Sequence, residues 1–590
     1  MRQTWKVIGS VLNQNTLSKI SESFKINGAN VTNPVEITEK FNDFFTTIGC
    51  NLAEHIPDSE TCFTDYLTGQ CNKNSFFIQP TSCSEVIEIV DQLKSKTSYG
   101  VDGIPISIIK ATIQNIAEPL SRLINCSIST GVFPANLKIG KICPVYKDGE
   151  KDSFSNYRPI SVLPSFSKIF EKIVSVRLYS YFDSNNIFSR VQYGFRQNHS
   201  TYMAILDMYS RISSALDRSE FSIGIFIDLS KAFDTLNHSI LLHKLEYYGI
   251  RGLPLKWLES YLLNRQQCVC INNTTSSLKY VTCGVPQGSI LGPLMFLIYI
   301  NDIVKCSPTL DKILFADDTN LFHSDKNIQN LFNTVNSELS SLSNWFKANK
   351  MSLNIKKTKY ILFTNKKVDL IGLNLDLNID GIVLDCVDST KFLGVIVDKK
   401  LSWHDHINHI SSKISRGLGI LGRVRRLLPR EILLLLYHTL IYPYLSYCCI
   451  AWGRAAKNVL SRLIILQKRA VRIITGAEYR ASTGSLFKEL NILKLADICL
   501  FQTSQFMFNF KNGLLPIACS DFCMWSDSIV YNIRHHSVFK APPFRTLVYE
   551  RSIRVSGPKQ WDSLSPDLQN ISNLVLFKLK LKLCLIAKYT

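Results

Sequence analysis

Three aspartates stand where acidic side chains could act together on metal ions. Asp228 ends a run of apolar residues, and Asp317 and Asp318 adjoin each other farther along the chain. Carboxylate oxygens are ligands that Mg²⁺ prefers, although the ion keeps several of its waters. Two such ions about 4 Å apart can activate an attacking hydroxyl oxygen and stabilise a departing phosphate group. The three aspartates are therefore candidates for metal-dependent phosphoryl transfer, if the fold brings them together.

Either feature alone also has an ordinary explanation. An aspartate at the end of a strand is usually a cap or a turn residue, and an Asp-Asp pair is usually a solvated turn. The carboxylates become a site only if rigid elements make them converge.

Apolar periodicity predicts such elements. Residues 221–229 are expected to form a buried strand that ends at Asp228, with Phe226 on the face opposite its odd-numbered apolar residues. Residues 313–322 are expected to form a hairpin with the two adjoining aspartates at its tip. One apolar stripe predicts a helix over residues 328–346, of a length that could pack beneath the sheet.

Composition points to a polyanionic partner. The 590 residues include 67 Lys and Arg against 47 Asp and Glu, a net charge of +20, and the length predicts several domains. Nucleic acid and an anionic membrane both suit this charge, and so does an unrelated basic protein. The 17 cysteines contain no Cys-x-x-Cys pair, which favours reduced intracellular thiols over a zinc or disulfide framework.

One segment requires a membrane test. Residues 432–452 carry no formal charge over nearly a spanning length, but Pro443 would break a helix there. We therefore expect a buried helix followed by a turn, and no stable membrane association. The chain start lacks the apolar core of a signal peptide. A membrane-associated basic protein that uses this segment remains an alternative.

Seven motifs in a fixed order complete the pattern. They are NYRPIS (156–161), QYGFR (192–196), FIDLSKAFD (226–234), GVPQGSILGP (284–293), FADD (315–318), LNIKKTK (353–359) and KFLGV (391–395). Their order, spacing and flanking residues resemble the reverse transcriptases of LINE-type non-LTR retrotransposons, in particular the jockey-like branch. The resemblance is strong over about residues 85–400.

The resemblance implies roles at the reaction centre. Asp228 and Asp317 would hold two Mg²⁺ ions, for which Mn²⁺ could substitute, and Asp318 would be a third, less essential carboxylate. Lys357 would donate a proton to pyrophosphate, although the neighbouring lysines leave this role open. Phe233 would be a steric gate that clashes with a 2′-hydroxyl, unless it is simply core packing.

The resemblance also implies contacts to the nucleotide. Gln287 and Gly288 would touch the incoming nucleotide or the template base, and an ordinary strand-to-helix turn is the alternative. Arg158 and Arg196 would clamp the triphosphate, because guanidinium forks suit phosphate oxygens. Either arginine could instead form a structural ion pair.

Basic side chains after the last motif suggest a grip on template and primer. A helix is expected over residues 407–428, with apolar residues on one face and cations elsewhere. Such cations supply affinity for the backbone without reading sequence. The candidates are Lys413, Arg416, Arg423, Arg425 and Arg426.

The implied fold is α+β, a right-hand polymerase with fingers, a palm built on an antiparallel sheet, and a helical thumb. We expect a helical connector (1–75), fingers (76–200), palm (201–370), thumb (371–480) and a C-terminal helical region (481–590). The reverse transcriptase domain overall would span about 127–400. The C-terminal region, with Trp561 and the lysine-rich run 578–582, is a candidate for RNA contact.

The implied activity is RNA-directed DNA synthesis from dNTPs on an RNA template and a DNA primer, by a soluble intracellular ribonucleoprotein of nucleus or cytoplasm. The endonuclease usual in the family is not apparent, so nicking would come from elsewhere. The main alternative is a catalytically silent relic that only binds nucleic acid. A maturase-like or telomerase-like lineage is another.

Overall fold

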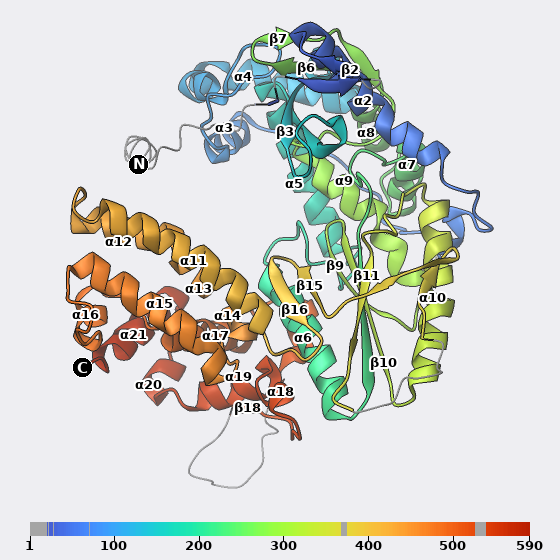
Figure 1. The fold of residues 1–590 in the computed structure, drawn as a ribbon. Coiled ribbons are helices and arrows are strands. Elements are labelled where there is room, and N and C mark those ends of the chain that lie inside the picture. Colours follow the sequence, from blue (N-terminus) through green and yellow to red (C-terminus); the bar gives the residue numbers. More distant parts are fainter. Residues whose placement is uncertain (1–19, 22, 27–28, 70, 367–374, 526–537) are drawn as a thin grey trace.

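The strand that leads to Asp228 is the centre of a five-stranded sheet in the computed structural model, which describes residues 20–21, 23–26, 29–69, 71–366, 375–525 and 538–590 (Figure 1). Neighbouring strands run antiparallel except for the parallel pair β11 and β14. In spatial order the strands are β14 (Asp385–Cys386), β11 (Lys359–Phe363), β5 (Phe221–Ile227), β10 (Asp318–Asp325) and β9 (Asp311–Phe315). The predicted strand and hairpin are thus confirmed. The hairpin turn is formed by Ala316 and Asp317, so Asp318 begins β10 and is not at the tip as expected.

Each face of this sheet faces a different core. Ile223 and Ile225 belong to a buried cluster with the apolar stripe of α10 (Ile328–Ala348). Phe226 points to the other face, into a cluster with α6 (Thr201–Asp217) and the C-terminal helices. The two-residue alternation of the strand therefore serves two cores. The predicted helix beneath the sheet is α10, and α6 on the other face was not predicted.

A second five-stranded sheet, built from residues in the N-terminal half of the chain, lies at the top of Figure 1. It contains β3 (Ile139–Tyr146), β4 (Tyr157–Val162), β6 (Arg265–Ile271), β7 (Thr274–Thr275) and β8 (Lys279–Val281). β3 pairs in parallel with β6, which joins segments far apart in the sequence. Six helices pack against one another beside the sheets, with α5 and α9 between the two sheets in Figure 1: α3 (Cys83–Gln92), α4 (Ile106–Thr130), α5 (Ser165–Ser184), α7 (His238–Tyr247), α8 (Leu253–Leu262) and α9 (Leu291–Tyr299).

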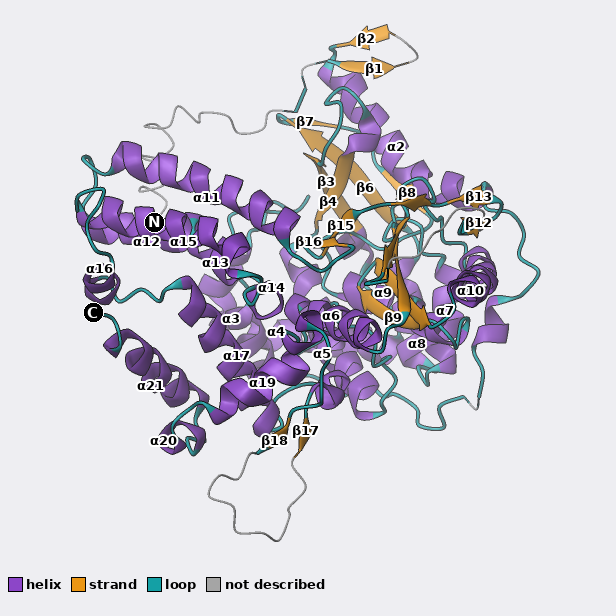
Figure 2. Cartoon of the chain, turned by 60° about the horizontal axis from the view of Figure 1, so that its bottom comes forward, coloured by secondary structure: helices purple, strands orange, loops and turns teal. Residues whose placement is uncertain are grey.

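The expected N-terminal connector is part of this second sheet region. Its first 19 residues lie outside the described residues, and the rest includes the hairpin of β1 (Phe24–Ile26) and β2 (Ala29–Val31), seen at the top of Figure 2. Helix α2 (Pro34–Glu54) follows and packs against β6, β7 and β8. Its Phe41 and Phe45 lie in a buried cluster with Tyr157 and Val269. This segment is therefore docked on the sheet and does not act as a free linker.

The chain after Trp403 is mostly helical, as expected, and forms the left part of Figure 1. The main helices are α11 (His404–Val424), α12 (Arg430–Leu440), α15 (Lys457–Thr475), α17 (Leu495–Lys511), α19 (Ile553–Asp562) and α21 (Leu574–Ala587). A hairpin of β15 (Ser389–Phe392) and β16 (Val395–Asp398) links them to the first sheet. The predicted apolar face of α11 is buried from Ile407 to Leu421.

The uncharged segment 432–452 folds as three short helices instead of one helix and a turn. They are α12, α13 (Tyr442–Ser446, with Pro443 in its first turn) and α14 (Cys449–Trp452). Leu445 and Trp452 are fully buried in the protein. In the described part of the chain, no helix combines the length and the apolar character that crossing a bilayer requires.

Candidate active site

Asp228 and Asp317 line one cavity of about 450 Å³. Their strands are neighbours, because Ile227 of β5 pairs with Thr319 of β10. Antiparallel pairing therefore brings together carboxylates that are distant in sequence. The same cavity is lined by Lys147, Asp148, Ser155, Asn156, Arg158, Ile160, Leu229, Ser230, Lys231, Ala232, Phe233, Gln287, Asn354 and Lys357.

The carboxylates repel one another. Partial removal from water raises the pKa of Asp317, and the charge of Asp228 raises it further, while Arg158 and Lys147 oppose the shift. Desolvation together with the charges of Asp317 and Asp228 raises the pKa of Asp318 to about 6. Keeping these neighbouring carboxylates ionised costs free energy, and a cation bound between them would lower that cost.

Asn354 fixes the backbone and side chain of Asp228. Its amide nitrogen Nδ2 donates to Asp228 Oδ2 at 3.0 Å, and its backbone N–H donates to the Asp228 carbonyl at 2.9 Å. The Thr358 hydroxyl accepts a long bond of 3.4 Å from the Asp228 N–H. One carboxylate oxygen of Asp228 is thus committed to positioning, and Oδ1 is left for a ligand.

The hairpin turn before Asp317 is supported by the QYGFR segment. Gln192 Oε1 accepts from the N–H groups of both Gly194 and Ala316, at 2.8 and 3.0 Å. A Cβ on Gly194 would lie 2.2 Å from the Ala316 nitrogen, so only glycine allows this approach. The Tyr193 N–H donates to the Leu314 carbonyl and the Leu314 N–H donates to the Val191 carbonyl, which adds the segment to the edge of β9.

The turn that carries Gln287 is held from several sides. Gln287 Nε2 donates to both carboxylate oxygens of Asp234, at 2.8 and 2.9 Å, and the Gln287 carbonyl accepts from the Ser161 N–H at 2.8 Å. Gly288 has a φ of +131°, and a Cβ there would lie 2.5 Å from the Ser161 carbonyl oxygen. The Ser289 hydroxyl accepts from the Gly292 N–H at 2.9 Å, which satisfies a free donor in the first turn of the following helix.

A second cap for the following helix comes from another element. Glu171 of α5 is fully buried, and its Oε2 accepts from the N–H groups of Ile290 and Leu291 at 2.6 and 3.2 Å. These are the first free donors of α9, where a negative charge is favoured. Glu171 therefore anchors the helix that begins immediately after the Gln287 turn.

Phe233 lies in the cavity wall on a rigid support. Its ring stacks on Phe296 with centroids 4.6 Å apart, and Phe195 meets its edge at 6.2 Å. The ring is half-buried and lines the cavity. The position is compatible with the expected gate under a sugar, and the stack on Phe296 means that the ring also packs on the core.

The cations expected at the nucleotide divide into two groups. Arg158, on β4, and Lys357 line the cavity with the carboxylates. Arg196 does not. Its guanidinium lies over the Phe188 ring, donates to the Ser189 carbonyl at 3.1 Å and approaches Asp183 at 3.4 Å, in a separate pocket. The structural ion pair that was the alternative for Arg196 is what the structure contains.

The basic residues expected to hold template and primer lie on the C-terminal helices. Lys413, Arg416 and Arg423 are on α11, which ends at Val424, so Arg425 and Arg426 follow it in a turn and are not helical as predicted. A groove of about 490 Å³ between α11 and α15 has Arg423, Arg425, Arg469 and Arg472 in its lining.

The donor set at the cavity suits a hard divalent cation. Within the described ranges, no three or more His, Cys, Asp or Glu side chains form a preassembled metal cage. Mg²⁺ does not need such a cage, because it is commonly bound by one or two carboxylates together with substrate phosphates. Asp228 and Asp317 supply carboxylates, and Asp318 begins the strand beside them.

Several residues that shape the site were not predicted. Asn354, Asp234 and Gln192 lie inside the recognised motifs but had no assigned role, and Glu171 lies outside them. One feature of the sequence could have indicated Glu171. It is an acidic residue within the apolar repeat of a helix, and a buried acidic side chain requires a hydrogen-bond partner. The partner itself could not be found without the fold.

Comparison with known proteins agrees with the motifs. Residues 147–397 match the family model described as reverse transcriptase (RNA-dependent DNA polymerase). The chain is 29% identical over 449 residues to a probable RNA-directed DNA polymerase from transposon BS of Drosophila melanogaster, covering 73% of this chain and 48% of the relative. It is 27% identical over 437 residues to the RNA-directed DNA polymerase from mobile element jockey of the same fly, covering 71% and 46%.

A probable RNA-directed DNA polymerase from the Drosophila melanogaster transposon X-element is similar at 27% identity over 435 residues, covering 71% of this chain and 47% of the relative. The chain thus spans about half the length of the curated relatives it matches. The matched region contains both strands that bear the aspartates, the Gln287 turn and Asn354. Residues 147–397 thus match a reverse transcriptase domain model, and the chain is similar over about 70% of its length to polymerases of Drosophila transposable elements.

Proposed function

We propose that this chain is an RNA-directed DNA polymerase that adds deoxynucleotides to the 3′-hydroxyl of a primer on an RNA template. The observation that carries the proposal is the shared cavity of Asp228, Asp317, Arg158, Phe233 and Gln287. Carboxylates for metal, a cation for phosphate, a rigid ring and an amide-bearing turn are what nucleotidyl transfer requires of a protein. The similarity to proteins named as RNA-directed DNA polymerases supports the same activity.

Asp228 and Asp317 would hold two divalent cations, Mg²⁺ or Mn²⁺, with Asp318 as the third carboxylate. Bound there, such ions would activate the attacking 3′-oxygen and neutralise charge on the leaving pyrophosphate. Asn354 orients Asp228 so that Oδ1 is available. The positive charge of Arg158, which already acts on Asp317, would bind the triphosphate. Lys357 would supply the proton for pyrophosphate.

Selection of the sugar would depend on Phe233. Because the ring stacks on Phe296, it cannot turn aside without losing that contact. A ribose 2′-hydroxyl would therefore meet a fixed surface. Gln287 would contact the nucleotide through its side-chain oxygen Oε1, since Nε2 is bound to Asp234.

The arrangement supports a right-hand description. The five-stranded sheet with α6 and α10 would be the palm, the second sheet with α3, α4 and α5 the fingers, and α11, α12 and α15 the thumb. The arginine-lined groove between α11 and α15 would bind the sugar-phosphate backbone of template and primer. The proposed regions are 76–200 for the fingers, 201–370 for the palm and 371–480 for the thumb, except that β6, β7 and β8 complete the fingers sheet and β14 completes the palm sheet.

Primer extension on an RNA template with Mg²⁺ tests the proposed function. Wild-type protein should extend a DNA primer, and Asp317→Ala should reduce the rate by about a thousandfold or more, since metal positioning supplies most of the catalysis. Asp58→Ala is the matched control, because the Asp58 side chain is fully exposed. Salt-sensitive RNA binding without any extension would contradict the proposal and support a silent, nucleic-acid-binding relic.

A further inference from the structure

Helix α2 contacts the Gln287 turn from behind, through one glycine. Gly49 is buried, and a Cβ at that position would lie 2.1 Å from the carbonyl oxygen of Asp234 and 2.6 Å from Cys283 Sγ. Gly284 approaches the same oxygen, with its own Cβ position 2.7 Å away. Three segments distant in sequence thus meet at the Asp234 carbonyl without room for a methyl group.

This contact lies directly behind Gln287. Asp234 holds the Gln287 amide through both carboxylate oxygens. A small cavity of about 50 Å³ behind the turn is lined by Phe45 and Thr46 of α2 as well as by Asp234 and Gln287. A displacement of α2 at this point would therefore reach the Gln287 side chain through a single intervening residue.

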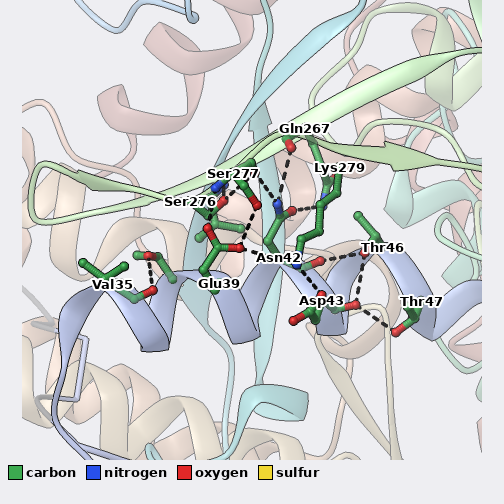
Figure 3. Close-up of polar contacts among 12 residues, drawn as sticks. Val35, Glu39, Asn42, Asp43, Thr46, Thr47, Gln267, Ser276, Ser277 and Lys279 are labelled. Carbon is green, nitrogen blue, oxygen red and sulfur yellow. Dashed lines mark hydrogen bonds and ion pairs between the residues drawn. The ribbon is translucent and has the colours of Figure 1, made fainter.

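The helix is fixed six to ten residues before this contact, by Glu39, Asn42 and Asp43. Figure 3 shows its polar anchors: Asn42 Nδ2 donates to the Ser277 carbonyl at 2.8 Å, and Glu39 Oε2 accepts from the Ser277 hydroxyl at 2.8 Å. Asp43 forms an ion pair with Lys279 of β8, the strand that leads to Cys283 and Gly284. The anchors join α2 to the chain that carries the turn, so the two should move together.

A glycine inside a helix has a cost that this contact explains. Alanine is the better helix former, and the backbone of Gly49 does not have a positive φ that would require glycine. The close approach to Asp234 does require it. Gly49 also lies outside residues 147–397, so the reverse transcriptase domain alone does not include it.

We propose that Gly49 is a positioning residue for the incoming nucleotide, which sets the place of Asp234 and thereby of the Gln287 amide. The N-terminal helix α2 is then a part of the nucleotide site and not only a fold support. The inference rests on the proposed function, because it assigns Gln287 to the nucleotide.

Steady-state primer extension with Gly49→Ala tests this assignment. The added methyl must displace Asp234, so we expect KM for dNTP to rise on the order of tenfold, because the Gln287 contact would weaken equally in the ground state and the transition state. The kcat at saturating dNTP and the Kd for template and primer should stay within about twofold, since neither depends on this contact. Thr47→Ala is the matched control, an exposed position two residues earlier in the same helix.

Alkylation of Cys283 supplies a readout that does not require activity. Cys50 Sγ lies 3.4 Å from Cys283 Sγ, and Gly49 covers the same sulfur. Displacement in Gly49→Ala should therefore change the rate of Cys283 alkylation, measured by mass spectrometry. A changed alkylation rate with an unchanged KM overturns the inference, and so does no change in either quantity.

A second variant covers the case in which Gly49→Ala does not fold. Asp43→Asn weakens only the partly exposed ion pair with Lys279, so it should leave the fold intact and raise KM in the same direction by a smaller factor. An unchanged KM in Asp43→Asn would then overturn the inference. Wild-type protein that extends no primer overturns the proposed function itself, whereas normal KM in the variants overturns only the role of α2.

Discussion

The Gln287 amide and the Asp234 carboxylate form a two-point hydrogen bond, with Nε2 at 2.8 and 2.9 Å from the two oxygens. An ionised carboxylate only accepts hydrogen bonds, so the amide must present its nitrogen to Asp234 and its oxygen elsewhere. Asp234 thus decides that the Gln287 side chain has its oxygen, and not its nitrogen, available for the proposed contact with the nucleotide.

Titration of Asp234 should be visible in the stability of the protein. Burial raises the pKa of this carboxyl to about 6 from an unfolded value of 3.8, against the opposing effect of Gln287. The folded chain then holds more protons than the unfolded chain between about pH 4 and 6. Its contribution to the unfolding free energy must therefore fall as pH rises through that window, by at most about 3 kcal/mol.

Thermal unfolding of wild type and Asp234→Asn across pH 4 to 7 checks this expectation. The Tm difference between them should shift steadily in favour of Asp234→Asn as pH rises to about 6, because the variant has no charge to bury. Asp58→Asn, at a fully exposed position, should follow the wild type. A pH-independent Tm difference would contradict the titration.

Gly288→Ala should distort the Gln287 turn and destabilise the protein. The new Cβ would meet the Ser161 carbonyl at 2.5 Å, at a φ of +131° that disfavours any L side chain, so we expect a loss of about 1–3 kcal/mol and a raised KM for dNTP. Gly381→Ala separates clash from strain, since its φ is +78° and nothing lies within 4 Å of the Cβ position. Equal losses in the two variants would show that the approach to Ser161 is unimportant.

Phe233→Ala should relax the choice of sugar. Removing the ring opens the space that Phe296 support keeps closed, so the ratio of kcat/KM for dNTP over rNTP should fall by about tenfold or more. Phe233→Tyr keeps the ring and should keep most of the discrimination. Single-nucleotide incorporation on one primer measures both ratios, and an unchanged ratio in Phe233→Ala would make the ring a packing residue only.

Glu171→Ala should weaken the turn from behind. Two backbone donors at the start of α9 lose their acceptor in a buried setting, which should cost about 2 kcal/mol or more in stability. Glu171→Gln keeps one acceptor oxygen and should lose less. Thermal unfolding compares both with Glu88→Ala at an exposed helix position, and a Tm equal to that control would remove Glu171 from the support of the turn.

Local pattern was enough to predict the elements that carry the carboxylates. The alternation around Phe226 predicted a strand, and the apolar stripe of α10 predicted a helix. Each pattern also indicated which side chains point toward which core. The order of the motifs then indicated that Asp228 and Asp317 share a site. Their common cavity is the simplest result of pairing β5 with β10.

Contacts between residues that only the tertiary fold brings together could not be predicted from the sequence. Arg196 has the residue type of a phosphate ligand, yet Asp183 and the Ser189 carbonyl engage it elsewhere. Asn354 binds Asp228 across more than a hundred positions, and nothing in its neighbours distinguishes it from an ordinary turn residue. The docking of α2 depends on Ser277 and Lys279, which a helical pattern alone cannot reveal.

The residues that line the cavity are far apart in the sequence, and this has a consequence for biosynthesis. Its lining runs from Lys147 to Lys357, which a ribosome needs on the order of ten to forty seconds to synthesise. Until Asn354 has emerged, β5 has neither β11 nor the Asn354 donors at its end, and its unpaired edge invites association with other nascent chains. Translation products that stop before this point should therefore aggregate or occupy chaperones, whatever the state of the residues already made.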